Sequence, residues 1–274
     1  MKKKIDRDTI IENKVEFLKD IIDSDSFFRK KNILPYGGHW IFFNQSFSKK
    51  DTGKDGHPKR GQFLPALKGY KRMFAGADLN FKNDISFGTN LKKISFIKSI
   101  IEKKNNNNKL YFAKVLNKYF NKEIECLDEI QTLVFINNNY KILKKKKTKN
   151  KNLDIKFVST KSFIFSTIEL FKYSALTFNS HRIHYDLKYA KGVEGYKNLL
   201  VHGPLLATKV LDEINKIIKS KLKSFHFSII RPVFVNEKFL IKIYNCKLNK
   251  KKFFVFIIKK SSEELAFKAE AFLI

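Results

Sequence analysis

Residues 202–222 read HGPLLATKVLDEINKIIKSKL, and this stretch decides the fold of the second half of the chain. Its apolar residues recur at helical spacing along one long face, and Pro204 suits the first turn of a helix. The residues of this face are Leu206, Val210, Leu211, Ile214, Ile217 and Ile218. Four strand-like runs follow, at 225–235, 238–247, 252–260 and 265–274. A long helix followed by four antiparallel strands predicts an α+β fold in which the sheet curls around the helix.

The residues before this helix carry the most distinctive side chains of the second half. Residues 155–166 alternate as a strand, and a short helix is expected over 168–174. Residues 171–208 then contain three of the six histidines together with Gly192, Gly195 and the pair Gly203-Pro204. If the protein carries out chemistry, this segment is where we expect it.

The first half of the chain has a different sequence pattern from the second. An amphipathic helix is predicted over 7–23, and residues 34–76 form a long Gly- and Pro-rich block that reads as a structured loop. Such a loop is either a functional lid or a surface excursion. The strand-like runs that follow predict an antiparallel sheet, with a hairpin turn at 105–108. They lie at 77–84, 85–101, 109–121 and 130–137.

A basic, low-complexity stretch separates the two halves. Residues 141–152 lack apolar periodicity and are interpreted as a solvated linker. The predicted division is therefore an N-terminal domain at 1–140, this linker, and a C-terminal domain at 153–274 that carries the histidine segment.

Composition limits the function classes. The chain has 274 residues, a hydrophobic fraction of 43% and a net charge of +30. The charge is spread through an Asn-, Ile-, Phe- and Lys-rich sequence, so we do not expect nucleic acid as a partner, although a basic non-catalytic binding or scaffold protein stays as an alternative. Two distant cysteines suit a reducing compartment. A secretory signal is not expected, because the first residues contain no apolar run, and no apolar run approaches about 20 residues. A cytoplasmic protein without membrane contact is expected, or a mitochondrial matrix protein if the source is eukaryotic.

The histidine segment suits acid–base chemistry. Asn179, His181 and His184 lie within six residues, and Gly203 at a helix start offers an uncrowded N–H for a developing oxyanion. The alternative is that these histidines are structural residues whose hydrogen bonds are all made within the protein. No metal is expected, because a His-x-x-His pair without a nearby acidic or Cys ligand is weak evidence for one. Neither a phosphate loop nor a G-x-S-x-G elbow occurs.

Two blocks of motifs resemble the MaoC-like hot-dog hydratases and dehydratases. YSALTFNSHRIHYD at 173–186, EGY at 194–196 and VHGPLLAT at 201–208 look most like the mesaconyl-C4-CoA (3-methylfumaryl-CoA) hydratases. They are also similar to the mitochondrial-type 3-hydroxyacyl-thioester dehydratases. In the first half, GHWIFF at 38–43, DGHPKRGQFLP at 55–65 and RMFAG at 72–76 are similar to the N-terminal domain of the same subgroup. The resemblance implies a double hot-dog, in which each half of the chain is a long helix wrapped by an antiparallel sheet. In the first half, no such helix is obvious near residues 34–76.

The resemblance also implies roles for single residues. His184 matches the catalytic His of the family, whereas Asn179 stands where the wider family carries Asp and cannot itself exchange a proton. We expect His184 to act as general base or acid, Asn179 to orient water or the thioester unless it only caps the following turn, and the Gly203 N–H to hold the thioester oxygen. The remaining candidates for substrate binding are Thr177, His181, Arg182, His202, Pro204, Lys59, Arg60 and Arg72. The last three are candidates for CoA phosphates or are ordinary surface charge.

The resulting prediction is a hydro-lyase that adds water reversibly to an α,β-unsaturated acyl-CoA, with mesaconyl-C4-CoA to citramalyl-CoA as the first choice. Dehydration of a 3-hydroxyacyl-ACP or -CoA in fatty-acid synthesis is the alternative reaction. No cofactor is expected besides the CoA of the substrate, and a homodimer is left open.

Overall fold

The computed structural model describes residues 2–25, 32–61, 63–105, 108–137 and 154–274. Its centre is one antiparallel sheet with the strand order β1-β3-β4-β5-β2-β7-β10-β9-β8-β6. The five strands of the first half are β1 (Lys3–Thr9), β2 (Tyr70–Phe81), β3 (Asn90–Asn105), β4 (Asn108–Asn121) and β5 (Ile124–Asn137). Those of the second half are β6 (Ile155–Phe163), β7 (Leu222–Ile229), β8 (Phe239–Cys246), β9 (Lys252–Lys259) and β10 (Leu265–Leu273). The halves are joined where β2 pairs with β7, with Gly76 opposite Ser228.

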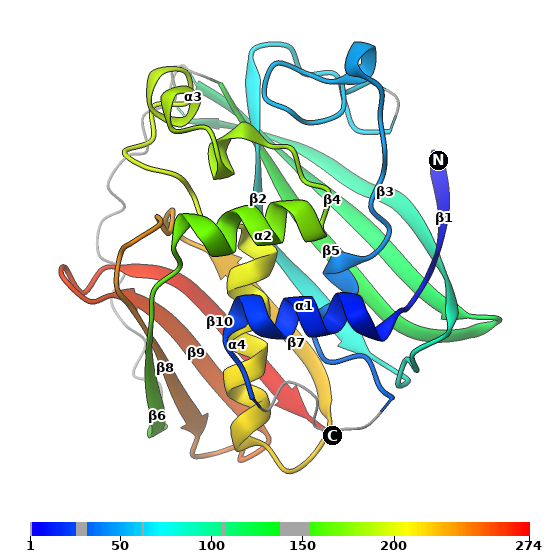
Figure 1. Cartoon of the computed structure of the whole chain (residues 1–274). Coiled ribbons are helices and arrows are strands. Elements are labelled where there is room, and N and C mark those ends of the chain that lie inside the picture. The colour runs from blue at the N-terminus through cyan, green and yellow to red at the C-terminus, as the bar shows by residue number, and fades with distance from the viewer. Residues whose placement is uncertain (1, 26–31, 62, 106–107, 138–153) are drawn as a thin grey trace.

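The helix predicted from the opening stretch is confirmed as α4 (Gly203–Ile217). The strands β7, β10, β9 and β8 curve around it (Figure 1). Even its charged residues Lys209, Asp212 and Glu213 are buried. A helix enclosed on all sides needs partners for such groups. The Lys209 Nζ donates to the Ile22 carbonyl at 2.7 Å, and the Ser24 hydroxyl donates to Asp212 Oδ1 at 2.6 Å.

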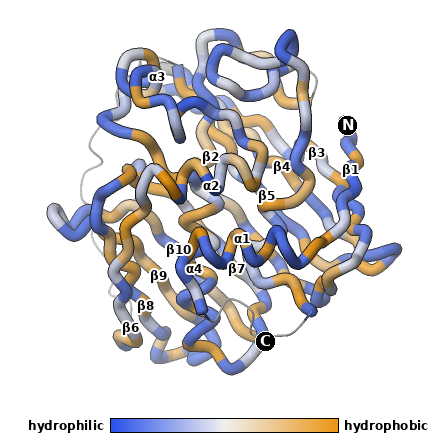
Figure 2. The backbone as a smooth tube through the Cα atoms, in the orientation of Figure 1, coloured by the Kyte–Doolittle hydropathy of each residue, from blue (hydrophilic) through white to orange (hydrophobic). Residues whose placement is uncertain are grey.

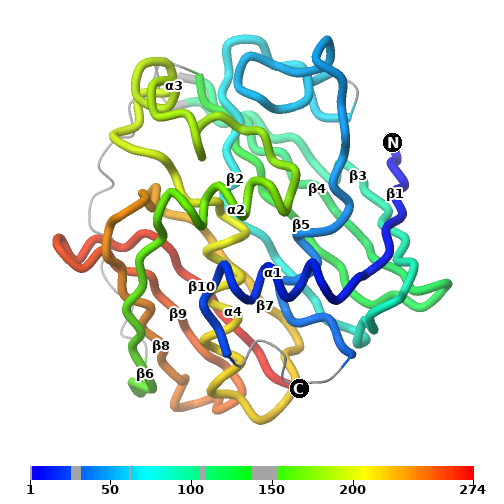
Figure 3. Tube along the Cα trace, viewed as in Figure 1, coloured from blue at the N-terminus to red at the C-terminus, as the bar shows by residue number. Residues whose placement is uncertain are grey.

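Two further helices lie across α4, as Figures 1 and 3 show. They are α1 (Glu12–Ile22), which follows β1, and α2 (Thr167–Leu176), and they pack against each other. Hydrophobic and hydrophilic residues alternate along α1 (Figure 2), and its apolar face, with Val15 and Leu18 fully buried, enters the common core. The N-terminal segment therefore closes the structure over residues that lie far away in the sequence.

Several sequence predictions need correction. The helix expected over 7–23 begins only at Glu12, because the alternating residues Lys3–Thr9 pair with β3 as an edge strand. The loop predicted over 34–76 ends earlier, since Tyr70 already begins β2. The run 225–235 is strand only to Ile229, as Pro232 cannot donate a ladder hydrogen bond.

In its described part, the first half also lacks the long helix that the resemblance implies. Its described part contains one α-helix, α1, of 11 residues, and the Gly- and Pro-rich block holds two 3-10 turns, at Gly38–Ile41 and Lys49–Asp51. Glycine and proline disfavour a continuous helix there. The predicted linker 141–152 and the tip of the 105–108 hairpin, residues 106–107, lie outside the described residues, so the domain division stays a prediction. No helix of the described chain combines the length and apolar character that crossing a membrane requires.

Candidate active site

One cleft of about 920 Å³ gathers most of the residues singled out from the sequence. Its walls come from the segment after α2, the start of α4, the loop around His57, and strands of the first half. The predicted site residues along it are Thr177, Asn179, His181, His184, His202, Gly203, Pro204 and Arg72. These side chains come from both halves of the chain, so the cleft exists only when the two halves are joined.

The end of α2 sets the position of Asn179. Ser166 and Glu169 form a capping box at the start of this helix, and at its end the backbone of Asn179 donates to the Ser174 carbonyl at 2.8 Å. The side-chain oxygen of Asn179 accepts from the His181 N–H at 3.0 Å. Asn179 thus caps the turn, which was the structural alternative, and at the same time lines the cleft. Its oxygen is engaged, which leaves its amide NH₂ for a ligand.

His184 is held in one tautomer. Its Nδ1 lies 2.8 Å from the Leu200 carbonyl oxygen, and because a carbonyl only accepts, Nδ1 carries the proton. In the neutral ring Nε2 is therefore unprotonated and can accept a proton. Burial lowers the pKa of His184 to about 4, against a smaller opposing effect of the Leu200 bond. The imidazole is neutral at physiological pH, as a general base must be.

His184 belongs to a row of four imidazoles. Its ring stacks on His202 with centroids 3.6 Å apart and meets the edge of His181 at 5.5 Å, and His181 lies 4.0 Å from His57. His202 shares a hydrogen bond of 2.9 Å between its Nε2 and the Ser174 hydroxyl. Burial lowers the pKa of His57, His181 and His202 as well, so the row is uncharged near neutral pH.

His57 was not among the site residues predicted from the sequence. The loop that carries it docks on the histidine segment, where the Arg182 N–H donates to the Asp55 carbonyl at 2.9 Å and the Ser180 hydroxyl donates to the Gly56 carbonyl at 2.5 Å. Gly56 has φ 88°, and a Cβ there would lie 1.8 Å from the Ser180 oxygen. Only glycine allows this approach. The DGHP motif was the signal that could have pointed to His57.

The start of α4 faces the same cleft. His202 precedes the helix, and the first N–H groups of a helix have no partner within it, so the Gly203 N–H is placed to stabilise negative charge on a ligand. A Cβ at Gly203 would lie 2.7 Å from both Phe74 Cδ1 and Ile229 Cδ1. Close packing of β2 and β7 against the helix start therefore requires glycine here.

Asp55, His57 and His181 have the spacing of a cation site. Their ligand atoms all lie within 4.8 Å of one another, and Asp55 Oδ2 is 3.5 Å from His57 Nδ1. The positive charge of Arg72 acts on the same group, because it helps to lower the pKa of His57 and of His181. That charge opposes a bound cation, and the expectation of no metal stays a prediction.

Three of the predicted substrate-binding residues do not line this cleft. Arg182 donates from Nη2 and Nε to a single oxygen of Asp186, Oδ2, at 2.7 and 3.0 Å. The Lys59 ammonium donates to the Lys50 carbonyl at 2.5 Å, and Arg60 donates to the Tyr70 carbonyl at 2.8 Å. These contacts hold loops in place, so any role in binding CoA outside the cleft stays a prediction.

The first half contributes a buried polar group to the cleft region. Glu129 is fully buried and accepts hydrogen bonds from four side chains, at 2.7–3.0 Å. The donors are Trp40, Asn117, Tyr119 and Gln131. Burial alone would raise the pKa of Glu129, but the nearby His39 and these bonds hold it at about 2. The carboxylate is therefore ionised and fixes the wall of the cleft.

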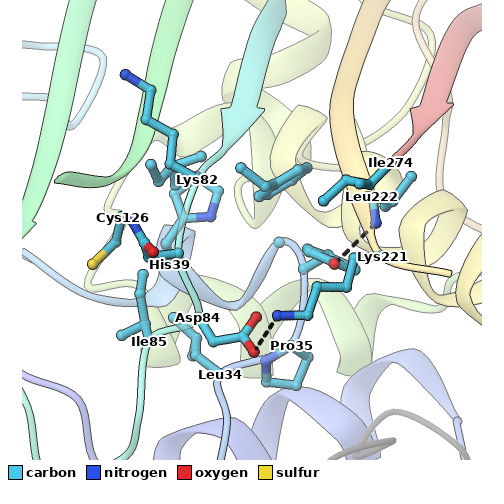
Figure 4. Close-up of a pocket in the computed structure, with 15 residues that line it drawn as sticks. Leu34, Pro35, His39, Lys82, Asp84, Ile85, Cys126, Lys221, Leu222 and Ile274 are labelled. Atoms are coloured by element: carbon cyan, nitrogen blue, oxygen red, sulfur yellow. Dashed lines mark hydrogen bonds and ion pairs between the residues drawn. The ribbon is translucent and has the colours of Figure 1, made fainter. Parts of the chain in front are cut away.

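A second cavity is too small for a substrate. It has about 50 Å³ and lies near the C-terminal end of the chain, where the Asp84 carboxylate faces Lys221 at 2.9 Å (Figure 4). Its lining includes His39, which also lines the large cleft and lies 3.9 Å from the Glu129 carboxylate. We place the active site in the large cleft.

Comparisons with known proteins agree with this geometry. A family model described as hydroxyacyl-thioester dehydratase type 2 matches residues 37–235, which include both the His57 loop and the histidine segment. The chain belongs to this family. Over 201 residues it is 32% identical to the mesaconyl-C(4)-CoA hydratase of Chloroflexus aurantiacus, a match that covers 73% of this chain and 71% of that protein. It is therefore a hydratase or dehydratase of acyl thioesters, and the prediction of a hydro-lyase is confirmed.

Solved structures confirm the fold of this family member. A MaoC-like dehydratase from Phytophthora capsici aligns with 100% of the chain and 95% of its own at a TM-score of 0.72 and 15% identity. A double-hotdog-fold protein from Mycobacterium tuberculosis aligns with 100% of the chain and 97% of its own at a TM-score of 0.57 and 11% identity. The predicted α+β double hot-dog is thus confirmed. Membership of an enzyme family also sets aside the alternative of a basic non-catalytic protein.

Proposed function

We propose that this enzyme adds water reversibly to the C=C bond of an enoyl-CoA thioester, and that it converts mesaconyl-C4-CoA to citramalyl-CoA. The observation that carries the proposal is His184, a neutral imidazole whose unprotonated Nε2 lies in the same cleft as the first N–H of α4. The identity with the Chloroflexus hydratase supports the choice of substrate. CoA enters as part of the substrate, and no other cofactor takes part.

The reaction follows from these two groups. His184 Nε2 removes a proton from water, and the resulting hydroxyl bonds to the β-carbon of the enoyl group. The C=C electrons move towards the thioester, whose oxygen gains negative charge and is stabilised by the Gly203 N–H. His184 then returns the proton to the α-carbon, so that one water molecule has been added in full. Asn179, whose NH₂ is available, orients the water or the thioester.

Dehydration of a 3-hydroxyacyl thioester in fatty-acid synthesis is a second candidate. The apolar lining of part of the cleft supports it. Beyond the histidines, its wall is formed by apolar residues of β4, β5 and the loop before β2. These include Phe63, Leu64, Leu110, Phe112, Val115 and Leu133. Such a surface suits an alkyl chain, on ACP or CoA. We place either activity in the cytoplasm, or in the mitochondrial matrix of a eukaryote, and leave a homodimer open.

The test is hydration measured as loss of enoyl-thioester absorbance, with mesaconyl-C4-CoA, crotonyl-CoA and a long-chain enoyl-CoA compared at equal concentration. His184→Ala is expected to lower kcat by about 10²–10⁴-fold, the usual range for a general acid–base group. His226→Ala, which removes a histidine outside the cleft, is the matched control. A His184→Ala variant with full activity would show that this residue is not the base.

A further inference from the structure

Arg72 stands out among the cations near the histidines. It lies on β2 and lines the cleft together with His57 and His181. Its neighbour Lys71 is paired with Glu194 at 3.1 Å, and Arg60 donates to the Tyr70 carbonyl. Among the described residues, the guanidinium of Arg72 has neither a hydrogen bond nor an ion pair.

An unpaired guanidinium in a cleft is costly. Arg72 is only partly exposed, and burial lowers its pKa. The opposite charge that acts on it most is Asp55, which is already engaged with His57. Arginine presents a planar fork of donors that matches a carboxylate in two parallel hydrogen bonds. The side chain is therefore prepared for an anion that the protein itself does not supply.

The position of Arg72 relates this anion to the reacting bond. Residues two apart on a strand lie on the same face, about 6.6 Å apart. Arg72 is two residues before Phe74, whose ring reaches within 2.7 Å of the place of a Cβ on Gly203. Arg72 and Phe74 thus point to the same side of β2, and both Arg72 and the Gly203 N–H proposed for the thioester oxygen line the same cleft.

We propose that Arg72 binds a carboxylate on the acyl group, and that the enzyme is specific for short enoyl-CoA thioesters of dicarboxylic acids. The inference rests on the proposed hydratase function and names the residue that selects the substrate. In mesaconyl-C4-CoA the carboxylate is attached to the carbon that receives the hydroxyl group. Holding it at Arg72 therefore orients that carbon towards the water activated by His184. This role differs from the contact with CoA phosphates expected from the sequence.

The experiment compares two substrates that differ in the carboxylate. For Arg72→Gln, kcat/KM with mesaconyl-C4-CoA is expected to fall about 100-fold, mainly through KM, since one charged hydrogen-bonded pair is lost. Its kcat/KM with crotonyl-CoA, which has no carboxylate, is expected to stay within about twofold. Arg72→Lys keeps the charge without the fork and should recover part of the loss. Lys71→Gln removes the neighbouring charge on β2, which does not line the cleft, and is the matched control.

The outcomes separate the two proposals. Equal losses on both substrates, or no loss on either, would overturn the role of Arg72 in reading the carboxylate. A wild-type enzyme that hydrates crotonyl-CoA or a long-chain enoyl-CoA but not mesaconyl-C4-CoA would overturn this inference and leave the hydratase function standing. Turnover of no enoyl thioester would remove the proposed function and this inference with it. Circular dichroism shows whether Arg72→Gln folds, and if it does not, the same comparison is made with Arg72→Lys.

Discussion

Lowering the pH from 7 to 4 should destabilise this protein through His184. In the folded state burial holds the pKa of His184 at about 4, whereas the unfolded chain has the ordinary value of 6.5. Between these values the unfolded state binds a proton that the folded state does not, so stability falls as the pH falls. The difference of about 2.5 units, at about 1.36 kcal/mol for each unit, corresponds to a loss of about 3 kcal/mol.

The pH range in which stability is lost identifies the groups that cause the loss. The contribution of His184 is complete above pH 6.5, decreases down to about pH 4 and then levels off. Glu129 behaves in the opposite sense, because its folded pKa of about 2 lies below the ordinary 4.5. Its contribution is present above pH 4.5 and is lost only as the pH falls towards 2. The interval from 6.5 to 4.5 therefore reports on buried histidines.

Urea unfolding followed by circular dichroism at several pH values between 7 and 4 measures this loss directly. His184→Gln should reduce the slope of stability against pH by about one proton in this interval. The fall of kcat/KM of the wild type on the acid side should have its midpoint near pH 4, because the free enzyme needs neutral His184. A stability that stays flat between pH 6.5 and 4.5, together with an acid limb near 6.5, would refute the buried neutral His184.

Other perturbations test the remaining parts of the site. Gly203→Ala should lower kcat by about 10²-fold, because the added methyl group displaces the helix start and with it the N–H. An unchanged kcat would show that the methyl group fits without moving the helix start. Glu129→Gln should lower the free energy of unfolding in urea by roughly 3 kcal/mol, because it removes a charged acceptor from four donors. A change near zero would show that this hydrogen-bond network is not formed. Treatment with EDTA should leave activity unchanged, whereas a loss that Zn²⁺ restores would reveal a metal at Asp55, His57 and His181.

The second half could be predicted from sequence because its signals are local. The helical spacing of apolar residues predicted the helix α4, and the alternating runs predicted the strands β6 to β10. The opening segment was mistaken because residues 3–9 are held as a strand by pairing with β3. An edge strand is decided by its partner, and that partner begins about 80 residues later.

Only part of the candidate site could be predicted from the sequence, because the rest depends on contacts between distant residues. His181, His184 and Gly203 lie close together in the sequence, and their grouping was recognised from composition and motif. His57 enters through the close approach of Gly56 to Ser180, more than 120 residues away, a contact that no local pattern encodes. The distinction between Arg72 in the cleft and Arg60 outside it likewise depends on which face of a loop or strand turns inwards.

The proposed mechanism relies on a single base where the wider family is expected to carry two groups. The side-chain oxygen of Asn179 is occupied by the His181 N–H, and an amide does not titrate, so it can orient a ligand but cannot carry a proton. The proton taken from water must then stay on His184 until it reaches the α-carbon. A second cation in the row would oppose that protonated state, and burial keeps His57, His181 and His202 neutral. The anion proposed at Arg72 would balance the positive charge that His184 holds during the reaction, which joins substrate recognition to catalysis.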